Sequence, residues 1–174
     1  AIRKLNEDGL VIRKNNGYFV FQPSIHDIEE IFELRLIMDI AAVTKLITEV
    51  LPNNSEAYEQ LMKSYESTLE PVENNTNFVR SDEDFHDIII RLTGNTRMIS
   101  FYSDIRNQTR TFRRITSYNA NRVQQAQNFH EKIFLGLKNL DLDMAIAAIE
   151  KHIALSKQDA LLDFMPEDKE DNHK

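Results

Sequence analysis

Cysteine is absent from the 174-residue chain, and glycine and proline are scarce, with four residues of each. Without cysteine the chain has no disulfides and no thiolate metal sites, which favours a reducing intracellular compartment. The low glycine and proline content argues against a β-rich fold with many tight turns. No apolar run approaches the roughly 20 residues that span a bilayer, and the first residues lack a signal-peptide core. We therefore expect a soluble, cytoplasmic protein that does not enter a membrane.

Length and charge restrict the class of protein further. The chain is long enough for one domain to bury a sizeable core without a metal or a disulfide to hold it folded. Its net charge of −7 argues against a nucleic-acid surface over most of its length. In residues 1–20, however, four basic side chains outnumber two acidic ones, which leaves −9 for residues 21–174. The first twenty residues therefore form a different kind of surface.

Helical patterns occupy most of the sequence. Ser24 is followed three residues later by Asp27, which is the spacing of a capping box at a helix start. Apolar stripes and the positions of the prolines predict an all-α fold, a bundle of about six helices around a central polar cavity. The expected helices cover residues 24–50, 54–70, 73–93, 95–118, 121–139 and 142–164.

One short segment has the pattern of strands instead. "GLVIRK" and "GYFVFQ" are rich in β-forming residues, and "NNG" between them tolerates positive φ, so we expect a β-hairpin over residues 10–22. The preceding "AIRKLNED" and Gly9 are typical of the last turns of a helix with a glycine stop. We therefore expect this helix to begin before the first residue of the chain.

Three histidines and one aspartate fall on the inner faces of three predicted helices. Asp82 and His86 are four residues apart and so share one helix face, while His130 and His152 lie on apolar faces of two later helices. A single histidine in such a position is more often a hydrogen-bonded core residue than a ligand. Together, however, three imidazoles and a carboxylate suit a divalent cation with open coordination positions. The spacing leaves both interpretations open.

Arginines supply a second candidate site. Arg35 lies on the apolar stripe of the first predicted helix, with Asp39 one turn later. It either pairs with Asp39 or faces a cavity and binds a carboxylate through two hydrogen bonds. Arg106 and Arg113 share one side of the fourth predicted helix and are further candidates for the same pocket.

Several stretches resemble the GntR-type bacterial transcription regulators of the FadR subgroup. "AIRKLNEDGLVIRKNNGYFV" is similar to the end of the recognition helix and the wing of their winged helix-turn-helix domain. "FELRLIMD" is similar to the opening helix of their effector domain, and "DEDFHDIIIRLTGN" to its D-x-x-F-H stretch with a Gly-Asn turn. The resemblance covers the chain except its acidic tail.

This resemblance implies an antiparallel effector-sensing bundle of the FCD type, joined to a winged DNA-binding domain and forming a homodimer. Residues 1–22 would be the C-terminal part of the winged domain, without its first two helices and most of the recognition helix. Residues 23–164 would be the effector domain, and residues 165–174 a disordered tail. In the metal-binding branch of the family, the four protein ligands would be Asp82, His86, His130 and His152. Arg35 occupies the family's arginine position.

The sequence thus predicts a ligand-responsive transcription regulator that binds one divalent metal ion and a small organic acid or other carboxylate effector. Zinc is the first expectation, while nickel, manganese and iron suit the same donors. Operator DNA would bind when the full N-terminal domain is present, with Arg13 and Lys14 against phosphates. The alternative is a metalloenzyme that uses the aspartate and histidines to activate water. We expect no enzyme, because no further Glu, Tyr or Lys is visibly placed as a general base.

Overall fold

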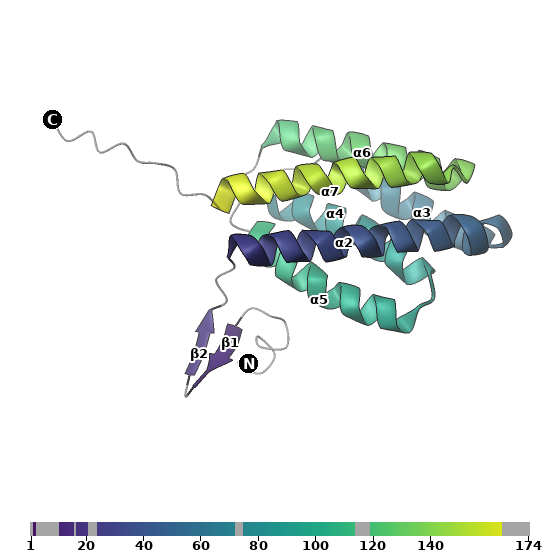
Figure 1. Ribbon diagram of the computed structural model, residues 1–174. Helices are drawn as coiled ribbons and strands as arrows, with labels where there is room; N and C mark the ends of the chain where they lie inside the picture. Colours follow the sequence, from purple (N-terminus) through teal and green to yellow (C-terminus); the bar gives the residue numbers. More distant parts are fainter. Residues whose placement is uncertain are drawn as a thin grey trace.

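The computed structural model describes residues 2, 11–15, 17–20, 24–71, 75–113 and 119–164. Six α-helices within these ranges form a bundle, as the sequence predicts (Figure 1). They are α2 (Ile25–Lys45), α3 (Ser55–Thr68), α4 (Asn75–Leu92), α5 (Thr96–Arg113), α6 (Ala120–Asn139) and α7 (Leu142–Phe164). In the same part of the chain, none of the helices is long and apolar enough to cross a bilayer.

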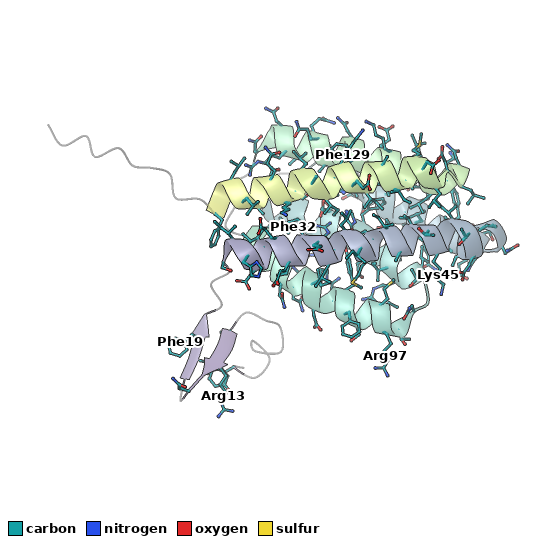
Figure 2. The ribbon with its side chains drawn as sticks, in the orientation of Figure 1. Arg13, Phe19, Phe32, Lys45, Arg97 and Phe129 are labelled. Atoms are coloured by element: carbon teal, nitrogen blue, oxygen red, sulfur yellow. The ribbon has the colours of Figure 1, made fainter. Side chains whose placement is uncertain are left out.

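The helices are arranged around α4. Figure 1 shows α2 and α7 side by side, with α6 beyond α7 and α5 on the other side of α2. Behind them, α4 packs against α2, α3 and α5, while α6 packs against α3 and α7. Phe32, for example, points from α2 into the bundle (Figure 2). A buried side chain on α4 can therefore meet others from several helices.

The first helix begins and ends for local reasons. The predicted capping box is confirmed: Ser24 Oγ accepts the N–H of Asp27 at 3.1 Å, and Asp27 Oδ2 accepts the N–H of Ser24 at 2.7 Å. At the other end α2 widens into a π-helical turn (Leu46–Val50) and a 3₁₀ turn (Leu51–Asn53). The second of these contains Pro52, which has no N–H to continue the α-helical pattern.

A tight turn joins α6 to α7. Leu140 takes a left-handed conformation with φ of 55°, and the N–H of Asp141 donates to the carbonyl of Gly136 at 2.8 Å. This is the hydrogen bond of a Schellman-type helix end. Gly136 also lies against α7, because a Cβ there would approach the backbone nitrogen of Ala145 to 2.7 Å. The two helices thus pack closely and antiparallel.

That close approach determines which residues of α6 and α7 face each other. His130 precedes Gly136 by six residues, and His152 follows Ala145 by seven. Positions at similar distances from the contact point of an antiparallel pair lie side by side. Accordingly, the ring centroids of His130 and His152 are 4.7 Å apart.

The predicted hairpin is confirmed within the described residues. Strand β1 (Val11–Lys14) pairs antiparallel with β2 (Gly17–Val20), and Asn15 in the turn has φ of 49°. Figure 2 shows Arg13 extending from this hairpin. The expected helix end at residues 1–9 lies outside the described residues apart from Ile2. Residues 114–118 and the tail at 165–174 also lie outside them.

The core combines apolar packing with a polar centre. Phe32, Phe85, Leu46, Leu61 and Ile133 are among the fully buried apolar side chains. In the described part of the chain, seven acidic, arginine or histidine side chains are buried among them: Arg35, Asp39, Asp82, Glu83, His86, His130 and His152. The expected central polar cavity is therefore a packed polar cluster.

Candidate metal centre

The four predicted ligand residues converge at the middle of the bundle. Asp82 and His86 come from α4, His130 from α6 and His152 from α7, and none is more than 1% exposed. One possible ligand atom from each lies within 4.8 Å of the other three.

The distances between these atoms are those of groups aimed at a common point. Nε2 of His130 lies 3.2 Å from Asp82 Oδ1, and Nε2 of His152 lies 3.4 Å from the same oxygen. With metal–ligand bonds of about 2.0 to 2.2 Å, neighbouring ligand atoms lie about 3.0 to 3.5 Å apart. The cluster therefore has the size of a single-ion site.

The imidazole nitrogens give an independent test of fit. Within the described part of the chain, both ring nitrogens of His86, His130 and His152 are buried and make no hydrogen bond. The short nitrogen–oxygen distances do not contradict this, because the atoms are close without the alignment that a hydrogen bond requires. Buried polar atoms normally have a partner, and coordination to a cation would supply one. The donor set thus fits a divalent metal ion.

Burial also keeps two of the imidazoles in the form that coordinates metals. Desolvation lowers the pKa of His130 and lowers that of His152 well below 6.5, although Asp82 partly opposes both shifts. Both rings are consequently neutral at neutral pH, and each has a lone pair available for a metal ion.

Two residues of α2 border the histidines. Arg35 Nη2 lies 3.5 Å from Asp82 Oδ2, and Arg35 Nε lies 3.6 Å from Asp39 Oδ2. The pairing of Arg35 with Asp39, one of the two alternatives that their spacing leaves open, is therefore present. Burial disfavours the charge of Arg35, but Tyr102, Asp82 and Asp39 outweigh it and raise the pKa of the guanidinium.

Two features of the centre were not predicted from the sequence. Asp39 Oδ2 also lies 3.1 Å from His86 Nδ1, a contact that depends on how α2 packs against α4. Tyr102 of α5 is buried beside Asp39 and Arg35, and burial raises the pKa of its hydroxyl well above 10, so it stays protonated. Its position on the stripe of Ile105 and Thr109 would have placed it on the inner face.

The remaining arginine and lysine residues predicted to bind the effector or DNA lie outside the cluster of Asp82 and the histidines, or are not described. Arg106 is 21% exposed and pairs with Asp87 at 3.0 Å, and it lines a void of about 10 Å³ together with Arg35. Arg13 is exposed on β1. The side chains of Arg113 and Lys14 are outside the described set.

Comparison with known proteins identifies the family. The FCD domain model matches residues 30–155. The HTH-type transcriptional regulator YdhC of Bacillus subtilis (strain 168) is 23% identical over 154 residues, covering 87% of this chain and 68% of YdhC.

Solved structures share the fold. A transcriptional regulator GntR from Rhodococcus sp. RHA1 has a TM-score of 0.67 at 21% identity, covering 92% of this chain and 76% of that one. The Zn²⁺-bound FCD domain of TM0439 has a TM-score of 0.64 at 20% identity, covering 82% and 96% respectively. These relatives are transcriptional regulators, which points away from an enzyme. The chain belongs to the FCD domain family and is an FCD-domain transcriptional regulator of the GntR family.

Proposed function

We propose that this regulator binds one divalent metal ion through Asp82, His86, His130 and His152, and that a small carboxylate effector binds beside it. One observation carries the proposal: four buried donors lie within 4.8 Å, and six imidazole nitrogens among the described residues lack a hydrogen bond. The zinc-bound state of the FCD domain of TM0439 supports it. Zinc is our first choice, and nickel, manganese and iron suit the same nitrogen and oxygen donors.

The charge of the centre supports an anionic effector. With neutral imidazoles, Asp39 and Asp82 contribute two negative charges and Arg35 one positive charge, so the cluster carries −1. A divalent ion would change this to +1, which a carboxylate balances. The bound ion would act as a Lewis acid with positions left for carboxylate oxygens. Arg35, buried beside Asp82, would orient the same group by hydrogen bonding.

The same proposal gives a role to each remaining part of the chain. The hairpin within residues 1–22 is the wing of a DNA-binding domain, and Arg13 and Lys14 contact operator phosphates. Residues 23–164 form the effector domain, which works as a homodimer. Effector binding would change the affinity of the intact regulator for its operator. The exposed position of Arg13 supports its role.

Metal content tests the site directly. The purified chain should contain about one equivalent of metal by elemental analysis, and His130→Ala and His152→Ala should lose it while circular dichroism remains helical. His26→Ala is the matched control, because His26 is an exposed histidine that pairs with Glu30 at 3.2 Å and is not one of the four proposed ligands. Full metal occupancy in both core variants would refute the site.

Ligand titration tests the effector. A panel of small carboxylates, each paired with its amide, should raise the melting temperature of the metal-loaded protein only in the acid form. Arg35→Ala should abolish this shift, and Arg35→Lys should restore part of it, since lysine keeps the charge without the planar fork. Equal responses to acids and amides would rule out carboxylate recognition.

A further inference from the structure

The candidate centre is closed to solvent, which raises the question of how anything reaches it. Its four ligand residues are at most 1% exposed. The adjoining void lined by Arg35 has a volume of about 10 Å³. Such a space holds about one water molecule, so a carboxylate needs some helices to separate before it can enter.

One seam of the bundle offers a polar route. The void lies where α2, α4 and α5 meet, and it is lined by Arg35, Glu83, Tyr102, Ile105, Arg106 and Thr109. This lining runs from Arg35, which is buried, to Arg106, which reaches the surface. The contact between α6 and α7 at Gly136 and Ala145 is instead too tight for an added methyl group. Of these two contacts, the first is the one that gives a charged ligand polar partners.

Two ion pairs close the outer side of this seam. Arg106 Nη1 lies 3.0 Å from Asp87 Oδ1, and Arg110 Nε lies 2.8 Å from Glu83 Oε2. Each pair joins α4 to α5. The two acids are four residues apart on α4, and the two arginines are four residues apart on α5. The two ion pairs therefore lie one helical turn apart and link the antiparallel helices like two rungs.

We propose that α5 is the gate of the centre: metal ion and carboxylate pass between α4 and α5, and the two rungs hold this passage closed. The proposal rests on the function proposed above. Figure 1 shows α5 at the edge of the bundle, and its described contacts are chiefly with α2 and α4. Gly94, with φ of 66°, lies in the turn just before α5. An incoming carboxylate can replace Asp87 as the partner of Arg106, while Asp87 keeps its ion pair with Arg91, so neither group loses all its partners.

A gate changes rates of entry and exit equally and leaves equilibrium affinity unchanged. We would load the whole chain with Zn²⁺, mix it with an excess of chromogenic chelator, and follow zinc release by stopped flow. The double variant Glu83→Gln, Arg110→Gln removes one rung without leaving a buried charge unpaired. It should release zinc about two- to fivefold faster, in line with the loss of one partly exposed ion pair. The zinc affinity from competition titration should stay the same.

Two further variants exclude a general loosening of the bundle. Arg110→Lys keeps an ion pair with Glu83 and should release zinc nearly as slowly as the original chain. Arg122→Gln, Asp159→Asn removes the 3.0 Å ion pair between α6 and α7 and should leave the release rate unchanged. The gate proposal would be wrong if this control released zinc as fast as the double variant at Glu83 and Arg110. It would also be wrong if that double variant changed the zinc affinity while its zinc association rate stayed the same.

Hydrogen exchange separates this inference from the metal site itself. In the metal-free protein, the double variant at Glu83 and Arg110 should speed amide exchange in α5 relative to α6 and α7. If the chain takes up no zinc, the metal site fails while faster exchange in α5 still supports a gate. Unchanged exchange in α5 would reject the gate whether or not zinc binds.

Discussion

Asp39 is the residue that connects the arginine of the centre to its histidines. One of its oxygens, Oδ2, lies 3.1 Å from His86 Nδ1 and 3.6 Å from Arg35 Nε. Carboxylates commonly accept a hydrogen bond from one nitrogen of a metal-binding imidazole and so orient the ring. Asp39 lies close enough to His86 Nδ1 to form such a bond once His86 Nε2 binds an ion. The role of Asp39 would therefore be to position His86.

Asp39→Asn should reduce zinc affinity by about 10- to 100-fold, the usual effect of losing such a supporting carboxylate. The metal content at saturating zinc should stay near one equivalent, because all four ligands remain. Glu33→Gln, an exposed change on the same helix, serves as the control in competition titrations. An unchanged affinity in Asp39→Asn would show that Asp39 only neutralises Arg35.

Buried neutral histidines also predict how the metal-free protein responds to acid. Burial lowers the pKa of His152 in the folded state, so below about pH 6.5 the unfolded chain binds a proton that the folded chain does not. Acidification below that pH must therefore reduce the free energy of unfolding, by about 1.4 kcal/mol per pH unit for each such group.

Urea titrations of the metal-free protein at pH 7.5, 6.5 and 5.5 measure this dependence. His152→Gln, which cannot titrate, should show a shallower loss of stability between pH 6.5 and 5.5 than the original chain. The exposed His26 again provides a control, and His26→Gln should follow the original curve. Parallel curves for all three proteins would mean that His152 is not held neutral by burial.

For single residues, the sequence predicts those site residues that are marked by their spacing along one helix. It misses contacts that depend on how two helices pack. Asp82 and His86 are visible because their spacing of four residues puts them on one face, and Arg35 and Asp39 are paired for the same reason. The contact of Asp39 with His86 crosses two helices and cannot be read from spacing. Tyr102 lies beside Arg35 only because α5 packs against α2, so spacing along α5 alone does not predict this contact.

Among the helices, the contact of α6 with α7 determines the geometry of the centre. Gly136 allows the two backbones to approach closely enough that His130 and His152 become neighbours. A methyl group added at Gly136 would meet Ala145 backbone atoms at 2.7 and 2.9 Å, and backbone cannot move aside as a flexible side chain can.

Gly136→Ala should therefore destabilise the fold by about 1 to 2 kcal/mol in chemical denaturation, the usual range for overpacking. Helix propensity alone predicts the opposite sign, since alanine in a helix interior is favoured over glycine by about 1 kcal/mol. Zinc affinity should fall as well, because a wider separation moves His130 away from His152. A stabilised variant with unchanged zinc affinity would contradict the close packing.

The helices themselves were predictable because each has its own apolar periodicity and is bounded by residues that start or stop helices. The capping box at Ser24 and the turn at Gly94 are readable in the sequence and occur where expected. The π-helical turn at Leu46–Val50 was not predicted, and the first helix was expected to continue regularly to residue 50. Its apolar residues continue the same pattern, so periodicity does not reveal the change in hydrogen bonding.

In the molecule as a whole, DNA contact and effector sensing are assigned to different parts of the chain. Arg13→Ala, Lys14→Ala, made in a longer protein with a complete winged domain, should weaken operator binding similarly for all sequences. The slope of log affinity against log salt should also fall by about one to two, because up to two phosphate contacts are lost. Binding measured at several salt concentrations checks this, and an unchanged slope would show that the hairpin does not touch phosphates.

The helix α2 belongs to both parts of this arrangement. Its capped start at Ser24 follows the end of β2 by four residues, and Arg35 lies eleven residues further along the same helix. At 1.5 Å per residue, about 16 Å of rigid helix separates these two points. The helix is thus a lever arm, and a tilt of about 10° at Arg35 displaces its start by about 3 Å. If an effector contact tilted α2 at Arg35 in the buried centre, the start of the helix, which follows the hairpin in the sequence, would move by this distance.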